Sequence, residues 1–106
     1  MGQLLLILFL AHKSIELTVT PRVCQAPCDI RLTVRIEPHP DNRAWRWVVD
    51  GPMYSASVQQ LDGADAPVTQ PHQWVKSLSP GDYEIRAEVW GAEKVQGVAV
   101  TTVLVQ

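Results

Sequence analysis

Apolar and polar residues alternate along several short segments of this chain, and such alternation predicts strands that bury one face. The clearest case is residues 83–90. Its apolar face consists of Tyr83, Ile85, Ala87 and Val89, and its polar face consists of Glu84, Arg86 and Glu88. The preceding Ser79-Pro80-Gly81-Asp82 predicts a turn, because proline fixes φ and glycine tolerates positive φ. The sequence therefore predicts a turn followed by a half-buried antiparallel strand.

Similar alternation predicts further strands on both sides of this one. They cover residues 15–20, 30–36, 45–49, 53–58, 73–78 and 95–105. Trp45 and Trp47 share one face, so at least one of them should lie in the core. Gly97 interrupts the last segment, which indicates a bulge or a division of the strand. About seven strands at intervals of roughly 8–12 residues, without helical periodicity, predict an all-β, two-layer antiparallel sandwich over residues 15–106.

Several short segments combine turn residues with strand residues: Thr20-Pro21, Ala26-Pro27, the strand from Ile30, Trp45-Arg46-Trp47 with Asp50-Gly51, and Leu78-Ser79-Pro80-Gly81-Asp82-Tyr83. In these segments the chain resembles immunoglobulin-like domains of bacteria and phages, most of all the PKD-like subgroup. The chain departs from the subgroup at Trp47-Val48-Val49-Asp50-Gly51, where a W-D-F-G-D-G-type segment is frequent. The resemblance implies a module for binding, spacing or assembly, usually without catalysis.

A short apolar segment, within residues 1–14, precedes the predicted sandwich. Residues 4–11 are eight consecutive apolar residues, whereas a helix needs about 20 to span a bilayer. The length suits a secretory signal, but no Lys or Arg precedes it, and Phe9 stands where a small residue is expected. Two hypotheses remain, a signal or a retained arm buried against a partner. The arm would contribute the side chains of Leu6, Leu8 and Leu10. Membrane contact is expected only through residues 4–11, if at all.

Composition and charge narrow the classes of partner. The chain has 106 residues, of which 46% are hydrophobic and 19% charged, as in a globular domain. Its formal net charge of −2 gives no electrostatic basis for binding nucleic acid. Residues 22–46 carry five arginines against three acids, and residues 50–106 carry three basic residues against seven acids. This asymmetry could orient docking between copies, although an uneven solvated surface is the more common reason for it.

Cys24 and Cys28 are the only cysteines and lie just before the second predicted strand. A zinc site needs four ligands, and only His39 lies nearby in the sequence, so zinc is not expected. A redox pair would have C-x-x-C spacing at the start of a helix, which is missing here. We therefore expect a local disulfide, which favours an oxidising, extracytoplasmic compartment.

Trp74 and Trp90 are the candidates for a functional surface. Trp90 follows Glu88 on the polar face of its strand, and Trp74 lies between Gln73 and Val75 on a short strand. An exposed tryptophan can anchor a protein contact or stack on a sugar ring. No further aromatic cluster accompanies them, so protein contact is the preferred hypothesis.

No motif predicts catalysis, a cofactor or a metal site. The three histidines, His12, His39 and His72, lie in the N-terminal tail or in proline-flanked loops, and neither H-E-x-x-H nor a Gly-rich phosphate loop occurs. Asp62 and Asp65 do not supply the six to eight convergent oxygens that calcium prefers.

We therefore expect a non-catalytic structural or protein-interaction subunit of an extracytoplasmic assembly, such as a virion surface, a cell envelope or an extracellular filament. It would contact neighbours, including copies of itself, through the apolar arm and the sheet edges. The alternative is a secreted carbohydrate-binding module that uses Trp74 and Trp90. Nucleic acid is not an expected partner.

Overall fold

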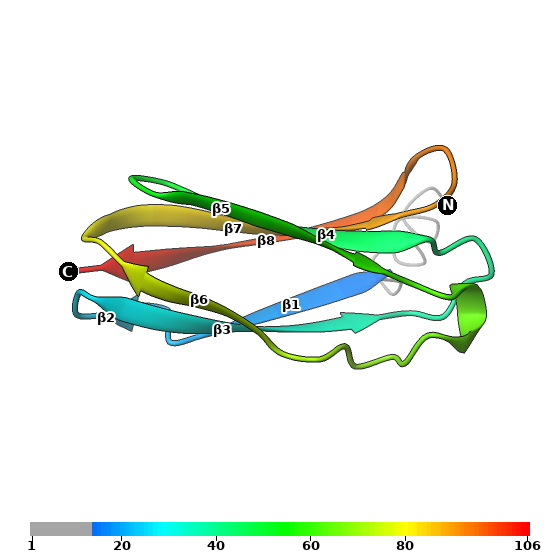
Figure 1. Ribbon diagram of the computed structural model, residues 1–106, viewed down its shortest axis with the longest axis horizontal. Helices are drawn as coiled ribbons and strands as arrows, with labels where there is room; N and C mark the ends of the chain where they lie inside the picture. The colour runs from blue at the N-terminus through cyan, green and yellow to red at the C-terminus, as the bar shows by residue number, and fades with distance from the viewer. Residues whose placement is uncertain (1–13) are drawn as a thin grey trace, which may run out of the picture.

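The computed structural model describes residues 14–106, which form two β-sheets packed face to face (Figure 1). The strands are β1 (Ile15–Thr20), β2 (Val23–Cys24), β3 (Cys28–Ile36), β4 (Ala44–Asp50), β5 (Tyr54–Gln60), β6 (Gln73–Leu78), β7 (Gly81–Trp90) and β8 (Val95–Val105), with a 3-10 turn η1 (Gly63–Asp65) after β5. One sheet has the order β1-β3-β6, and the other has the order β2-β8-β7-β4-β5. The predicted all-β antiparallel sandwich is confirmed.

The apolar segment at residues 4–11, with Leu6, Leu8 and Leu10, lies outside the described residues. Within residues 14–106, no helix is long and apolar enough to cross a membrane.

The core lies between the sheets and is built from the predicted apolar faces. Its fully buried members include Ile30, Leu32, Val34, Trp45, Val49, Tyr83, Ile85, Ala87 and Val89. Both Trp45 and Trp47 are buried. Their indole N–H groups donate to the side-chain oxygens of Gln70 and Gln73, at 3.2 and 3.4 Å. Each tryptophan therefore buries its rings without leaving a polar group unpaired.

The predicted turn before β7 forms a corner held by Tyr83. Its ring is buried, and its hydroxyl donates to the backbone oxygen of Ser79 at 2.8 Å. A tyrosine at the start of this strand that bonds back to the preceding turn is a feature of immunoglobulin-like sandwiches. Gly81 has a φ of 145°, and a side chain there would collide with Pro52, so the turn requires glycine.

The loop expected between the first two predicted strands contains an additional strand, β2, so residues 14–106 form eight strands where about seven were expected. Two residues are too few to show alternation, and β2 forms only because it pairs with residues at the end of β8, which are distant in the sequence. β2 runs parallel to β8, and the N–H groups of Leu104 and Gln106 donate to the oxygens of Arg22 and Cys24. The chain therefore crosses from the three-stranded to the five-stranded sheet and back within this loop.

The predicted disulfide between Cys24 and Cys28 is confirmed, with Cα atoms 6.2 Å apart. Cys24 ends β2 and Cys28 begins β3, so the bond joins the two sheets at one end of the sandwich. The irregularity expected at Gly97 also occurs, because the register of β7 and β8 shifts between the pairs Val89–Gly97 and Trp90–Val95.

Candidate interaction surfaces

The outward face of the five-stranded sheet carries most of the exposed large apolar side chains of the described residues. Seven of the ten lie on it: Val23, Tyr54, Val58, Trp90, Val98, Val100 and Leu104. We call this surface the apolar face. In β8 the side chains that alternate with them, Val103 and Val105, are buried, so this strand is apolar on both sides. Exposed apolar patches are more frequent at interaction sites than elsewhere on a protein surface, so this face is a candidate for one.

A group of charged side chains crosses the middle of the apolar face. Glu88 lies between two arginines, 3.8 Å from Arg46 and 3.6 Å from Arg86 (carboxylate oxygen to guanidinium nitrogen). Arg86 also lies 3.8 Å from Glu84. Glu88 occupies the outward face as its position in the sequence predicts, yet it is only 9% exposed. The two arginines compensate the charge that this burial desolvates.

Trp90 lies beside Glu88 and is fixed by it. The indole Nε1–H donates to the Glu88 carboxylate at 3.1 Å, and Trp90 as a residue remains 37% exposed. The backbone oxygen of Trp90 accepts a bond from the N–H of Arg43 at 2.8 Å. A large side chain that is already held in one orientation loses little conformational entropy when a partner covers it. Trp90 is therefore suited to anchor a contact.

Trp74 lies on the outward face of the three-stranded sheet, on the other side of the molecule from Trp90. It is 54% exposed. The guanidinium carbon of Arg31 and the ammonium of Lys76 lie 6.0 and 5.8 Å from its ring centroid, a distance at which cations are attracted to indole rings. The two exposed tryptophans therefore cannot form one platform for a sugar chain.

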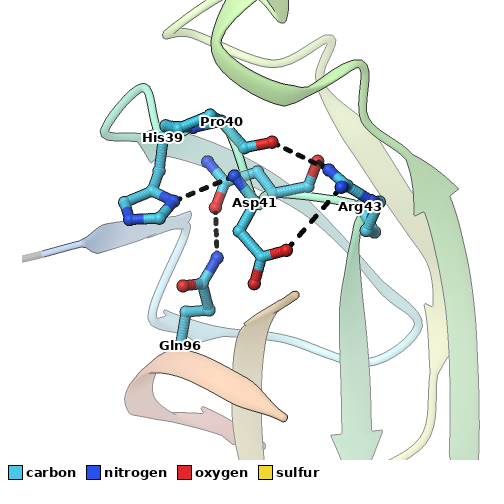
Figure 2. Close-up of polar contacts among 6 residues, drawn as sticks. His39, Pro40, Asp41, Arg43 and Gln96 are labelled. Atoms are coloured by element: carbon cyan, nitrogen blue, oxygen red, sulfur yellow. Dashed lines mark hydrogen bonds and ion pairs between the residues drawn. The ribbon is translucent and has the colours of Figure 1, made fainter. Parts of the chain in front are cut away.

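A polar cluster joins the loops at the end of the sandwich opposite to the disulfide (Figure 2). The backbone N–H of Asp41 donates to His39 Nδ1 at 3.0 Å. Arg43 donates to the backbone oxygen of Pro40 at 2.8 Å, and its guanidinium lies 3.7 Å from the Asp41 carboxylate. These contacts fix the connection between β3 and β4.

Asn42 lies at the centre of this cluster and is 3% exposed. Its side-chain amide donates to the backbone oxygen of Glu37 at 3.1 Å, and its side-chain oxygen accepts a bond from Gln96 at 2.8 Å. A pocket of about 360 Å³ lies here, lined among the described residues by Ser14, Glu37, Pro38, His39, Asn42 and Gln96. Because the Asn42 side chain binds Glu37 within its own connection and Gln96 in β8, it links the β3–β4 connection to β8.

Sequence reasoning selected Trp74 and Trp90 but missed the rest of the apolar face. The signal was present in β8, where the run from Val95 to Val105 is apolar at positions of both parities. Such a strand is expected to have both faces covered, but one face of β8 is exposed. The burial of Glu88 between two arginines cannot be predicted in this way, because its partner Arg46 lies on a strand far away in the sequence.

No protein-family model matches the chain, and no curated protein sequence matches it. Among solved structures, a superoxide reductase (neelaredoxin) from Ignicoccus hospitalis gives a TM-score of 0.66 at 13% identity, over 90% of this chain and 81% of that one. The CARDB domain of a Pyrococcus furiosus protein, in complex with di-metal ions, gives 0.56 at 16% identity, over 88% and 86%. The alkylpurine DNA glycosylase AlkC of Pseudomonas fluorescens gives 0.53 at 20% identity, over 93% of this chain but only 32% of the glycosylase.

At these identities the similarities show the fold alone, and the fold is an immunoglobulin-like β-sandwich. The same fold occurs in enzymes and in non-catalytic domains, so arguments about function must start from the surface of this chain. Within residues 14–106, no group of three or more His, Cys, Asp or Glu side chains could hold a metal ion.

Proposed function

We propose that this chain is a non-catalytic protein-interaction module of a larger extracytoplasmic assembly and that it docks through the apolar face. In this proposal the chain is a PKD-like member of the immunoglobulin-like domains. The apolar arm at residues 4–11 and the sheet edges supply further contacts with neighbouring subunits.

The observation that carries the proposal is Trp90 held by Glu88 among exposed apolar side chains. Val98 and Val100 are 47% and 51% exposed in the adjacent strand, β8. Interfaces combine such apolar groups with a few fixed aromatic anchors and paired charges. The Arg46–Glu88–Arg86 group supplies the paired charges, because its members already compensate one another before a partner arrives.

The disulfide supports the proposed location. Cys24 and Cys28 are bonded, and disulfides persist mainly in oxidising compartments. Virion surfaces, cell envelopes and extracellular filaments all meet this condition.

The test is the assembly of the purified full chain, measured by sedimentation velocity over a wide range of concentrations. In the Trp90→Ala variant, the midpoint concentration of assembly should rise about tenfold or more, because the interface loses an aromatic side chain that the partner would bury. The thermal unfolding midpoint should change little, since Trp90 is exposed at the end of β7. Trp90→Phe keeps an aromatic ring without the N–H donor. Its midpoint concentration of assembly should lie between those of the unaltered chain and of Trp90→Ala.

The matched control is Trp74→Ala, which removes an exposed tryptophan from the opposite face. It should assemble as the unaltered chain does. Equal weakening by both substitutions, or an unchanged Trp90→Ala variant, would contradict docking through the apolar face.

The carbohydrate-binding alternative now depends on Trp74, because Trp90 lies on the other side of the molecule. Trp74 is the more exposed of the two, and two cations, Arg31 and Lys76, lie near its ring. A glycan-array signal that disappears in Trp74→Ala and persists in Trp90→Ala would favour this alternative.

A further inference from the structure

The sheet order leaves four edge strands, β1, β6, β2 and β5, among the described residues. An edge strand presents unpaired backbone N–H and C=O groups, and proteins that remain monomeric protect such edges with charges, prolines, bulges or very short strands.

Three of the four edges carry such protection. β1 contains Glu16 and is followed by Pro21, and β2 has two residues between Pro21 and Pro27. β6 contains Lys76, and Ser77 in β6 has a φ of 61°. The register between β6 and β3 is also irregular between Cys28 and Ile30.

β5 carries none of these features. Its sequence is Y-S-A-S-V-Q-Q, with no charge, proline or glycine. It pairs with β4 in unbroken register from Tyr54–Asp50 to Gln60–Ala44. Its outward side chains Tyr54 and Val58 are 62% and 55% exposed. β5 is therefore a regular, neutral strand with one edge that no other strand of residues 14–106 covers.

We propose that β5 pairs with β5 of a second copy, antiparallel, about a two-fold axis at Ser57. This inference rests on the proposed assembly function and names one partner and one edge for it. The two five-stranded sheets would then form one continuous sheet, with the two apolar faces side by side.

The strand is complementary to itself in this register. The two Ser57 residues face each other at the axis, Val58 lies opposite Ala56, and Tyr54 lies opposite Gln60. Every opposed pair is neutral, and a larger side chain meets a smaller or flexible one, so no like charges oppose each other. The inward side chains Ser55, Ser57 and Gln59 are polar and half-buried, so pairing covers no unpaired charge. A self-complementary patch is the requirement for a two-fold dimer.

The test uses sedimentation equilibrium of the purified full chain, with substitutions at the proposed axis. The unaltered chain should dimerise. Ser57→Lys should raise the dimer Kd about tenfold or more, because two ammonium groups would face each other. Ser57→Glu should do the same, and an equal mixture of the two variants should dimerise again, since opposite charges then meet at the axis.

Thr18→Lys is the matched control, because it places the same charge on β1, an edge that is already protected. It should leave the Kd unchanged, and circular dichroism should show folded protein for all variants. A wild-type chain that stays monomeric, a Ser57→Lys variant that dimerises normally, or a mixture that does not dimerise would each overturn the pairing.

These results separate the inference from the proposed function. Loss of dimer in Ser57→Lys, with normal assembly in Trp90→Ala, retains β5 pairing and rejects docking through the apolar face. Assembly lost in Trp90→Ala, with an unchanged Kd in Ser57→Lys, rejects β5 pairing and retains the proposed function.

Discussion

The two outward faces of the sandwich differ in chemistry although the inward faces follow the same rule. The three-stranded sheet presents hydroxyl and charged side chains, including Thr18, Thr33 and Arg35, and Trp74 with two cations near its ring. The five-stranded sheet presents the apolar face, with Glu88 and its arginines in the middle. The first surface is mostly polar, and the second is the surface through which we propose that the chain docks.

This difference indicates that the outward side chains, and not the inward ones, distinguish the two sheets. The inward residues determine that two sheets pack, and they are similar in both layers. The outward residues do not take part in that packing, so their chemistry can differ between the two sheets, as it does here. Three experiments test how far the contrast between the two faces extends.

The largest expected effect concerns the bond that joins the two layers. In the double variant Cys24→Ser with Cys28→Ser, the free energy of unfolding should fall by about 2 kcal/mol, the chain-entropy estimate for so short a loop. Urea unfolding monitored by tryptophan fluorescence measures it, and the unaltered chain in reductant is the control. Assembly through the apolar face should persist, because that face does not include the disulfide. A fall in both stability and assembly would show that the two faces are not independent.

A smaller effect is expected for Glu88→Ala. The free energy of unfolding should fall by about 1–2 kcal/mol, because Arg46, Arg86 and the Trp90 indole N–H lose an acceptor. The control is Glu16→Ala, which breaks an exposed ion pair with Arg35 on the other face and should cost about 0.5 kcal/mol or less. Urea unfolding measures both variants. Equal losses in the free energy of unfolding would show that the partly buried Arg46–Glu88–Arg86 group stabilises the fold no more than the exposed Glu16–Arg35 pair.

The smallest effect concerns the local charge around the two exposed tryptophans. Iodide should quench Trp74 more strongly than caesium does, since Arg31 and Lys76 lie near its ring and attract anions. Trp90 should show no such preference, because Arg46 and Arg86 compensate the charge of the neighbouring Glu88. Trp74→Phe should therefore remove most of the difference between iodide and caesium quenching, and Trp90→Phe should leave that difference in place. Stability should change by less than about 0.5 kcal/mol in both. The same response to both ions would mean that the faces do not differ in charge.

The fold was largely predictable because each long strand carries its own local signal. Alternation located β3, β4 and β7, and the turn before Tyr83 predicted the corner that the hydroxyl bond completes. β2 was not predictable, because a two-residue strand has no period and depends on the end of β8. The disulfide followed from there being only two cysteines.

The surface was predictable only in part. Trp90 stands out because it interrupts a polar series along its own strand. The burial of Glu88 depends on Arg46, which is brought beside it by the pairing of β4 with β7. The free edge of β5 is also a property of the sheet order, since the sequence of a strand does not say which strands lie beside it.

The parallel pairing of β2 with β8 has a mechanical consequence. The start of β1 and the C-terminus lie towards opposite ends of the long axis (Figure 1). Tension between them would slide β2 and β8 past each other, so their backbone bonds would resist together and would not open one by one. The covalent bond between Cys24 and Cys28 would keep the intervening residues from extending. We therefore expect the pairing of β2 with β8 to resist stretching along the length of the domain.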